Sequence, residues 1–179
     1  FMIPLIVLTG PTTSGKSETA LELARKLNTE IISADSMQVY KYFDIGTAKN
    51  SASARQSIPH HLIDILEPED EFNAFDFKTQ ALATIHDLMS RNKIPIVVGG
   101  TALYLKVLIQ DYDCAVEISE ETRKKIQQEI LQQGVEQVYK SLQTIDPAFA
   151  EKISETDSLR IERALGVYRE TGKPFSEFH

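Results

Sequence analysis

The chain has only one cysteine and no long hydrophobic run. Cys114 cannot form an internal disulfide bond, so the protein does not need an oxidising compartment, and we expect it in the reducing cytoplasm. The longest apolar runs, residues 3–8 and 94–98, are far shorter than the roughly 20 residues that span a bilayer. We therefore expect no membrane-spanning segment. With 179 residues the chain is long enough for one domain, or for one domain with an insertion.

The chain also lacks an excess of basic residues. It has 19 Lys and Arg against 26 Asp and Glu, which gives a formal net charge of −7. A protein that binds nucleic acid without regard to sequence neutralises many phosphates and is usually strongly basic. We therefore expect any nucleic acid to be bound through a few local contacts of defined geometry, and not through a broad basic surface.

Apolar runs alternate with helical patterns up to about residue 110. Residues 3–8 and 94–98 are continuous branched apolar runs, typical of strands that are buried on both faces of a parallel sheet. Residues 30–34 and 61–66 are weaker strand candidates. Apolar residues at helical spacing lie between these segments. The pattern predicts an α/β fold with a parallel sheet flanked by helices.

Only helical patterns follow after about residue 111. The candidate helix caps there are Ser119, Asp146 and Asp157. We expect three parts: an α/β core of residues 1–112, an all-helical insertion of residues 113–156, and a helix within residues 157–179 that returns to the core.

One motif predicts a phosphate-binding loop, or P-loop. Residues 10–17 read GPTTSGKS and match G-x-x-x-x-G-K-[ST] in full, after a predicted strand and at the start of a predicted helix. Backbone N–H groups of such a loop surround a phosphate, and the helix N-terminus adds partial positive charge. We expect Lys16 to neutralise phosphate oxygens and the Ser17 hydroxyl to bind Mg²⁺. The predicted phosphate-binding residues are Gly10, Pro11, Thr12, Thr13, Ser14, Gly15, Lys16 and Ser17.

A P-loop predicts phosphate binding without defining the reaction. Hydrolysing P-loop enzymes usually carry an acidic residue at the end of an apolar strand, to hold the metal ion. Here residues 94–98 are followed by Gly99, Gly100 and Thr101, and the acid follows the second predicted strand, at Asp35. Because the carboxyl ends of parallel strands share one edge, we expect Asp35, Thr101 and the P-loop to meet in one crevice. An aspartate in that position can serve as a general base.

Six short blocks, in order along nearly the whole chain, carry a family resemblance. They are GPTTSGKS at 10–17, ISADSMQVY at 32–40, DIGTAK at 44–49, PHHLID at 59–64, VGGTALY at 98–104 and RIERAL at 160–165. Together they resemble the motif set of tRNA dimethylallyltransferase, the IPP transferase family. The resemblance implies a P-loop NTPase-like fold with Mg²⁺ as cofactor. It also implies transfer of a dimethylallyl group from dimethylallyl diphosphate to N6 of adenosine 37 in tRNA, next to the anticodon, with release of diphosphate.

The resemblance assigns roles to individual residues. It implies that Asp35 accepts the proton from the adenine N6 amine and that Thr101 hydrogen-bonds near the bridging oxygen of the diphosphate, while Lys16 stabilises the leaving group. The predicted catalytic residues are thus Asp35, Thr101 and Lys16. The predicted tRNA contacts are Asp35, Ser36, Met37, Gln38, Thr101, Arg123, Leu159, Arg160, Ile161, Glu162 and Arg163.

The resemblance also defines the expected partners and some departures from the family. We expect a monomer that binds the anticodon loop of tRNA and dimethylallyl diphosphate. Ser158 and Leu159 stand where the family usually has Pro-Gln, which removes one polar tRNA contact, and Ala102 replaces a common glycine. Members of the family continue beyond residues 171–177, so the resemblance implies that a C-terminal part is missing.

The residues alone leave other interpretations open. Arg160 and Arg163, three apart on a helix, can clamp phosphates or form a solvated charged face. We expect His60 and His61 to be structural or to support a site indirectly, because alternation along a strand puts them on opposite faces and no third metal ligand follows at a useful spacing. A P-loop kinase of a small molecule would need only the first 110 residues. A prenyltransferase for free adenine nucleotides would not need the helical insertion. A nucleotide-gated binding module would have no catalytic turnover, so Asp35→Asn would leave its binding intact and abolish no reaction.

Overall fold

The computed structural model describes residues 4–11, 14–110 and 116–178. The chain divides into two units, Phe1–Asp111 and Tyr112–His179. Cys114, together with Thr12 and Thr13 of the P-loop, lies outside the described residues.

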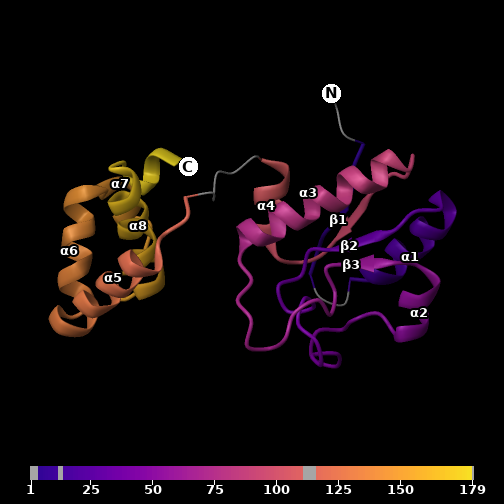
Figure 1. Ribbon diagram of the computed structural model, residues 1–179, viewed down its shortest axis with the longest axis horizontal. Coiled ribbons are helices and arrows are strands. Elements are labelled where there is room, and N and C mark those ends of the chain that lie inside the picture. The colour runs from indigo at the N-terminus through magenta and orange to yellow at the C-terminus, as the bar shows by residue number, and fades with distance from the viewer. Residues whose placement is uncertain (1–3, 12–13, 111–115, 179) are drawn as a thin grey trace. The chain divides into compact units, whose positions relative to one another are not determined.

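The first unit is built on a four-stranded parallel sheet (Figure 1). Its strands lie side by side in the order β1 (Ile6–Leu8), β4 (Ile96–Val98), β2 (Ile31–Ser33) and β3 (His60–His61). In the register, Ile31 lies opposite Ile96 on one side and His60 on the other. The central strands β2 and β4 are almost entirely buried, as continuous apolar strands of a parallel sheet should be. The predicted α/β class is confirmed.

The strand expected at residues 61–66 is much shorter in the structure. Only His60 and His61 pair with β2. Leu62 and Asp64 have positive φ values of 60° and 53°, which bend the backbone out of the extended conformation that a strand requires. Pairing resumes only as an isolated bridge between Leu66 and Tyr40. The apolar pattern of this segment comes from burial beside the sheet and not from a continuous strand.

The described residues of the first unit form four helices: α1 (Lys16–Leu27), α2 (Ala52–Ser57), α3 (Ala74–Ser90) and α4 (Ala102–Ile109). Helix α1 packs on β2 and β4, and its small residues Ala20 and Ala24 are buried against Ile31 and Ile96. Helix α3 begins at a capping box, because the Asn73 side chain accepts from the backbone of α3 while the Asp76 side chain accepts from the backbone N–H of Asn73.

The first unit is also held together by an aromatic contact between two of its helices. Helix α3 packs against α4, where the rings of Phe77 and Tyr104 stack with centroids 4.3 Å apart. Phe77 and Tyr104 are both buried, so this contact belongs to the core of the unit.

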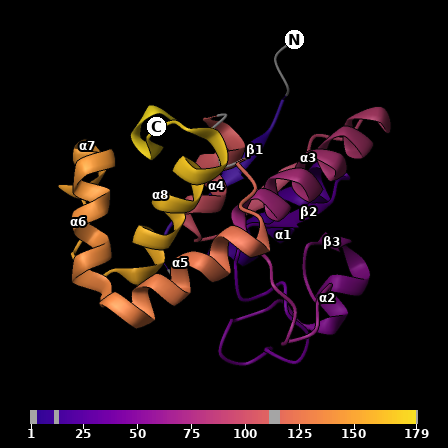
Figure 2. The same ribbon diagram turned by 60° about the vertical axis from the view of Figure 1, so that its left-hand side comes forward.

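Every element in the described part of the second unit is helical (Figure 2). The elements are α5 (Glu120–Gln133), α6 (Val135–Ile145), α7 (Pro147–Ala150), α8 (Ser158–Thr171) and the short 3₁₀ helix η1 (Phe175–Phe178). The predicted caps Ser119, Asp146 and Asp157 each accept a hydrogen bond from the backbone of the helix that follows. The sequence pattern therefore located these helix starts correctly.

Helix α8 is part of the core of the second unit. Its residues Ile161 and Leu165 are fully buried with Ile126 of α5 and Leu142 of α6. The buried Asp146 carboxylate also accepts from the backbone N–H of Ser176 at 2.7 Å, which ties η1 to the same core. The structure thus groups 157–179 with the preceding helices, unlike the three-part organisation that we expected. A contact of residues 157–179 with the α/β core stays a prediction.

Among residues 4–11, 14–110 and 116–178, no helix combines the length and apolar composition that crossing a bilayer requires.

Candidate active site

The P-loop follows β1 and leads directly into α1, as the motif predicts. Gly15 is the N-cap of α1 and has a φ of 80°, in the left-handed region that favours glycine. Gly10 also has a positive φ, 152°. Glycine adopts such backbone angles without the steric cost that a Cβ atom imposes, and α1 begins directly after Gly15.

The side chain of Lys16 is folded over this loop. Its ammonium donates to the carbonyl oxygens of Gly10 at 2.7 Å and Pro11 at 2.5 Å, and lies 3.4 Å from the Ser14 hydroxyl. The positive charge is therefore held inside the loop, where a phosphate group would be bound.

The ends of β2 and β4 approach each other unusually closely beside the loop. A Cβ atom on Gly99 would lie 2.1 Å from the carbonyl oxygen of Ala34, so only glycine fits there. Just beyond, the backbone N–H of Thr101 donates to the same Ala34 oxygen at 3.2 Å, and the backbone N–H of Ser36 donates to Oγ1 of Thr101 at 3.0 Å. The structure thus brings Thr101 against the Asp35 segment, as expected for the shared edge of a parallel sheet.

Asp35 shapes the turn that follows β2. Its Oδ1 accepts from the backbone N–H groups of Met37 at 2.9 Å and Gln38 at 3.4 Å. This local bonding is the usual way in which an aspartate stabilises a tight turn. It fixes the carboxylate at the carboxyl end of the sheet while leaving it on the wall of a cavity.

A cavity of about 390 Å³ joins the P-loop to the Asp35 segment. This volume is in the range typical of small-molecule sites. Its lining includes Lys16 and Ser17 of the P-loop and Asp35 and Gln38 of the segment after β2. Four predicted phosphate-binding residues therefore share this cavity with Asp35 and Gln38. Among the other predicted site residues of the first unit that the structure describes, Gly10, Pro11, Ser36, Met37 and Thr101 do not line it.

Gln38 is held rigidly in that cavity wall. Its Oε1 accepts from the Ser33 hydroxyl at 3.0 Å, and its Nε2 donates to the carbonyl oxygen of Thr47 at 2.9 Å. The orientation of the amide is therefore fixed by partners on both ends. Met37, next to it, is exposed.

Another part of the wall was not predicted from the sequence. It is formed by Thr47, Ala48, Asn50, His60 and Ile63. The signal was present, since four of these five residues fall in the blocks at 44–49 and 59–64. Neither block contains a motif of known chemistry, so the residues alone gave no reason to place them at the site.

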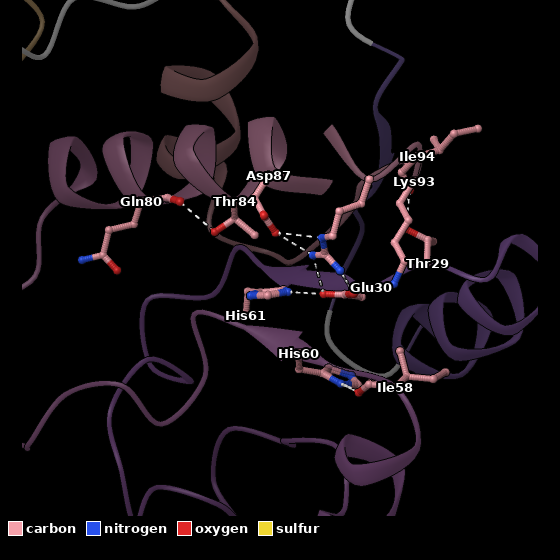
Figure 3. Close-up of polar contacts among 11 residues, drawn as sticks. Thr29, Glu30, Ile58, His60, His61, Gln80, Thr84, Asp87, Lys93 and Ile94 are labelled. Atoms are coloured by element: carbon pink, nitrogen blue, oxygen red, sulfur yellow. Dashed lines mark hydrogen bonds and ion pairs between the residues drawn. The ribbon is translucent and has the colours of Figure 1, made fainter. Parts of the chain in front are cut away.

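His60 presents a neutral ring to the cavity. Its Nδ1 lies 2.7 Å from the carbonyl oxygen of Ile58, which can only accept, so Nδ1 carries the proton and Nε2 accepts from Asn50 at 2.8 Å. Burial lowers the pKa of His60 below its ordinary value, which keeps the ring neutral at pH 7. His61 lies on the other side of β3, where its Nε2 is 2.7 Å from the Glu30 carboxylate (Figure 3). The two histidines thus have separate surroundings, as strand alternation predicts.

The second unit contains the other predicted tRNA contacts, in different environments. Leu159 is 77% exposed, and Arg160 is exposed with its guanidinium 3.1 Å from Asp157. Arg163 donates to the carbonyl oxygen of Val116 at 2.9 Å.

Three further predicted contacts lie on α5 and α8. Arg123 and Glu162 form an ion pair of 3.7 Å. Ile161 is fully buried in the core of this unit, so its side chain supports α8 and does not reach a ligand. The predicted contacts of the other five residues with tRNA stay predictions.

A metal site made by the protein alone is not found in the described residues, where no three His, Cys, Asp or Glu side chains are grouped to hold an ion. Ser17 and Asp35 do line the cavity. Mg²⁺ commonly binds to one or two protein oxygens and completes its shell with substrate phosphates and water. The residues present therefore fit a Mg²⁺ ion that is held mainly by a bound diphosphate.

The chain is similar to known proteins over nearly its whole length. The family model described as IPP transferase matches residues 38–179. The chain is 47% identical over 176 residues to tRNA dimethylallyltransferase 2 of Geotalea uraniireducens (strain Rf4), covering 98% of this chain and 57% of that protein. It is 46% identical over 177 residues to tRNA dimethylallyltransferase of Thermoanaerobacter sp. (strain X514), covering 98% of this chain and 56% of that protein. The chain thus spans a little over half the length of these curated relatives.

Solved structures show the same likeness. A crystal structure of a eukaryotic dimethylallyltransferase acting on tRNA superposes with a TM-score of 0.82 and 37% identity, over 98% of this chain and 44% of that one. The tRNA isopentenylpyrophosphate transferase of Bacillus halodurans gives a TM-score of 0.62 and 38% identity, over 97% of this chain and 58% of that one. The family match, covering most of the chain, leads to one conclusion: the chain belongs to the IPP transferase family.

Proposed function

We propose that the protein transfers a dimethylallyl group from dimethylallyl diphosphate to N6 of adenosine 37 in tRNA and releases diphosphate. The observation that carries this proposal is a cavity lined by both Lys16 of the P-loop and Asp35. Relatives whose names state this activity, at 46–47% identity, support it.

The phosphate side of the cavity suits a diphosphate leaving group. When the allylic carbon–oxygen bond breaks, its electron pair stays on the diphosphate oxygen. We expect Lys16 and the backbone N–H groups of the P-loop to stabilise that charge. The position of the Lys16 ammonium, which donates to the carbonyl oxygens of Gly10 and Pro11, supports this role for the lysine. Ser17 would hold Mg²⁺ together with the diphosphate. When bound, the ion supplies further positive charge to the leaving group.

The acceptor side of the cavity suits an adenine amine. The N6 lone pair forms the new carbon–nitrogen bond, and the proton that N6 loses passes to the Asp35 carboxylate. The hydroxyl of Thr101 accepts from the backbone N–H of Ser36, next to Asp35. The family resemblance gives Thr101 a hydrogen bond near the bridging oxygen of the diphosphate. No water needs activation in this reaction, so Gly99 and Gly100 at the end of β4 can stand where hydrolysing P-loop enzymes carry an acid.

The acceptor must be a base that leaves its stack to enter the cavity. Proteins read single-stranded RNA loops in this way, and extruding a base costs a few kcal/mol, least where it is unpaired. The anticodon loop of a tRNA meets that requirement. The net charge of −7 fits recognition of RNA by a few individual side chains, such as Arg160 and Arg163, instead of a basic surface. We propose that the protein acts as a monomer in the cytoplasm.

Replacing Asp35 by asparagine tests the proposal. The protein, Mg²⁺ and dimethylallyl diphosphate are incubated with an anticodon stem-loop bearing adenosine at position 37, and the mass of the nucleosides is measured. We expect transfer to fall by at least about 100-fold in Asp35→Asn, because the proton acceptor is lost. Binding of inorganic diphosphate should be retained, because the loop is unchanged.

The matched control is Asp70→Asn. Asp70 also accepts a backbone hydrogen bond, from Glu67 at 2.9 Å, but is not among the residues that line the cavity. This variant should transfer normally. A wild-type protein that adds no dimethylallyl group, or full transfer by Asp35→Asn, would contradict the proposal, and a phosphorylated small molecule as product would identify a kinase instead.

A further inference from the structure

Two of the six sequence blocks, residues 44–49 and 59–64, meet in one ion pair. The ammonium of Lys49, at the end of the first block, lies 2.5 Å from Oδ1 of Asp64, at the end of the second. The Lys49 side chain is only 1% exposed. Burying a lysine to this degree costs free energy unless its charge is fully paired, and the partners that pair it show which segments it connects.

Lys49 also closes the loop that precedes it. Its ammonium donates to the carbonyl oxygen of Tyr40 at 2.6 Å and lies 3.4 Å from the Asp44 carboxylate. Arg55 makes a second ion pair with Asp64. Lys49 thus joins both ends of the 40–49 segment to the turn that follows β3.

Asp64 in turn is bonded to the segment that carries the predicted base-binding residues. Its backbone N–H donates to the carbonyl oxygen of Gln38 at 3.1 Å, and the next backbone N–H, of Ile65, donates to Val39 at 2.9 Å. The Gln38 amide donates to the carbonyl oxygen of Thr47, two residues before Lys49. Gln38 and Thr47 line the cavity, whereas Lys49 and Asp64 do not. We call Gln38 and Thr47 the Gln38–Thr47 wall, and the ion pair supports this wall from outside the cavity.

The Asp64 carboxylate is ionised at neutral pH. Burial raises the pKa of Asp64, but hydrogen bonds from Lys49 and Arg55 outweigh it and hold the pKa below its ordinary value. Asp64 is therefore ionised and keeps both cations.

We propose that Lys49 is a positioning residue: through Asp64 it holds the Gln38–Thr47 wall at the place where the acceptor base must bind opposite the P-loop. The proposal rests on the proposed function for the identity of the acceptor. Lys49 acts through its neighbours and does not touch the reacting atoms. Errors of about 1 Å in such positioning can cost on the order of 100-fold in rate.

The variant Lys49→Met tests this, because methionine keeps the apolar stem and removes the charge. Three quantities are measured: hydrogen exchange of backbone amides in residues 38–50, the affinity for inorganic diphosphate, and kcat/KM for the anticodon stem-loop. We expect exchange in 38–50 to become at least about tenfold faster. We expect kcat/KM for the RNA to fall about 10- to 100-fold, with diphosphate affinity unchanged within about twofold, because the P-loop lies on other elements.

Lys41→Met is the matched control. Lys41 belongs to the same segment and pairs with Glu67 at 2.6 Å, but its side chain is 39% exposed, so its loss should change none of the three quantities. A double variant adds a second check. If Lys49 acts through Asp64, combining Lys49→Met with Asp64→Asn should cost less than the two single effects together.

Two results would overturn the inference. One is unchanged exchange in residues 38–50 of Lys49→Met. The other is a loss of diphosphate binding in proportion to the loss of RNA transfer, which would indicate general destabilisation. A wild-type protein that transfers nothing would refute the proposed function alone, because exchange and diphosphate binding would still decide the role of Lys49.

Discussion

At the scale of single residues, the site depends on one position where a side chain is impossible. Gly99 follows β4 at the point where its backbone meets the carbonyl group of Ala34, after β2. That contact lets Thr101 bond to Ala34 and to the Ser36 backbone. The spacing of these two strand ends therefore positions both Thr101 and the Asp35 turn.

We predict that Gly99→Ala destabilises the protein by about 3 kcal/mol, because a methyl group cannot be accommodated 2.1 Å from a backbone oxygen without moving a strand end. Urea unfolding measures the change. Gly46→Ala is the control, since an added Cβ there meets no atom within 4 Å, and it should alter stability by no more than about 1 kcal/mol. Equal stability of Gly99→Ala and wild type would show that the close approach is absent in solution.

At the scale of elements, a buried carboxylate joins three segments at the start of β2. Glu30 precedes β2, and its carboxylate accepts from Arg91 at 2.6 and 3.2 Å, from Lys93 at 2.6 Å, and contacts His61 of β3 at 2.7 Å (Figure 3). Asp87 of α3 also binds Arg91, at 2.6 Å. The group connects the end of α3 and the start of β4 to the central strands.

This cluster makes stability depend on pH. The hydrogen bond from Arg91, with those from Lys93 and His61, holds the pKa of Glu30 well below its ordinary value of 4.5, although burial opposes the shift. The folded protein therefore binds fewer protons than the unfolded chain below about pH 4.5. The stabilisation from Glu30 is present above that pH and is lost as the pH falls further.

We predict that Glu30→Gln costs about 2–3 kcal/mol at pH 6, because Arg91 and Lys93 lose a buried partner. Urea midpoints at pH 6 and pH 3.5 should show the gap between wild type and Glu30→Gln shrinking at the lower pH. In Glu67→Gln, where the ion pair with Lys41 is exposed, the cost should stay below about 1 kcal/mol at both values. A gap for Glu30→Gln that is constant with pH would argue against this account.

At the scale of the whole molecule, the chain consists of two units with separate cores. The helical unit buries Ile126, Leu142, Ile161 and Leu165, contributed by α5, α6 and α8. Most of the charged residues predicted to contact tRNA lie in this unit, whereas the phosphate loop and Asp35 lie in the other. The predicted tRNA contacts are thus divided between the two units, whereas the predicted catalytic residues all lie in the first unit.

We predict that Leu142→Ala, which leaves a cavity at a fully buried position, costs about 2–5 kcal/mol in the helical unit alone. Hydrogen exchange should become faster in α5, α6 and α8, while the affinity for inorganic diphosphate stays at the wild-type value. Leu131→Ala, at a side chain that is 85% exposed, should be neutral within about 0.5 kcal/mol. Loss of diphosphate binding in Leu142→Ala would mean that the two cores unfold together.

The amino-acid sequence by itself determined the features that depend on local pattern. These are the P-loop between a strand and a helix, the parallel sheet, the helix caps at Ser119, Asp146 and Asp157, and the shared edge that brings Asp35 near Thr101. Each follows from neighbouring residues or from the general geometry of parallel strands. The six blocks added the family, which the comparisons confirm.

The tertiary structure alone decided which distant residues meet. The pairing of Lys49 with Asp64, the inclusion of His60 and Asn50 in the cavity wall, and the burial of Ile161 join segments separated along the chain. The short range of β3 also follows from backbone angles at Leu62 and Asp64, which the apolar pattern of that segment does not reveal. Such contacts depend on how whole elements pack. Parallel-strand geometry predicts that strand ends such as those before Asp35 and Thr101 meet, but it does not identify which side chains pair beyond them.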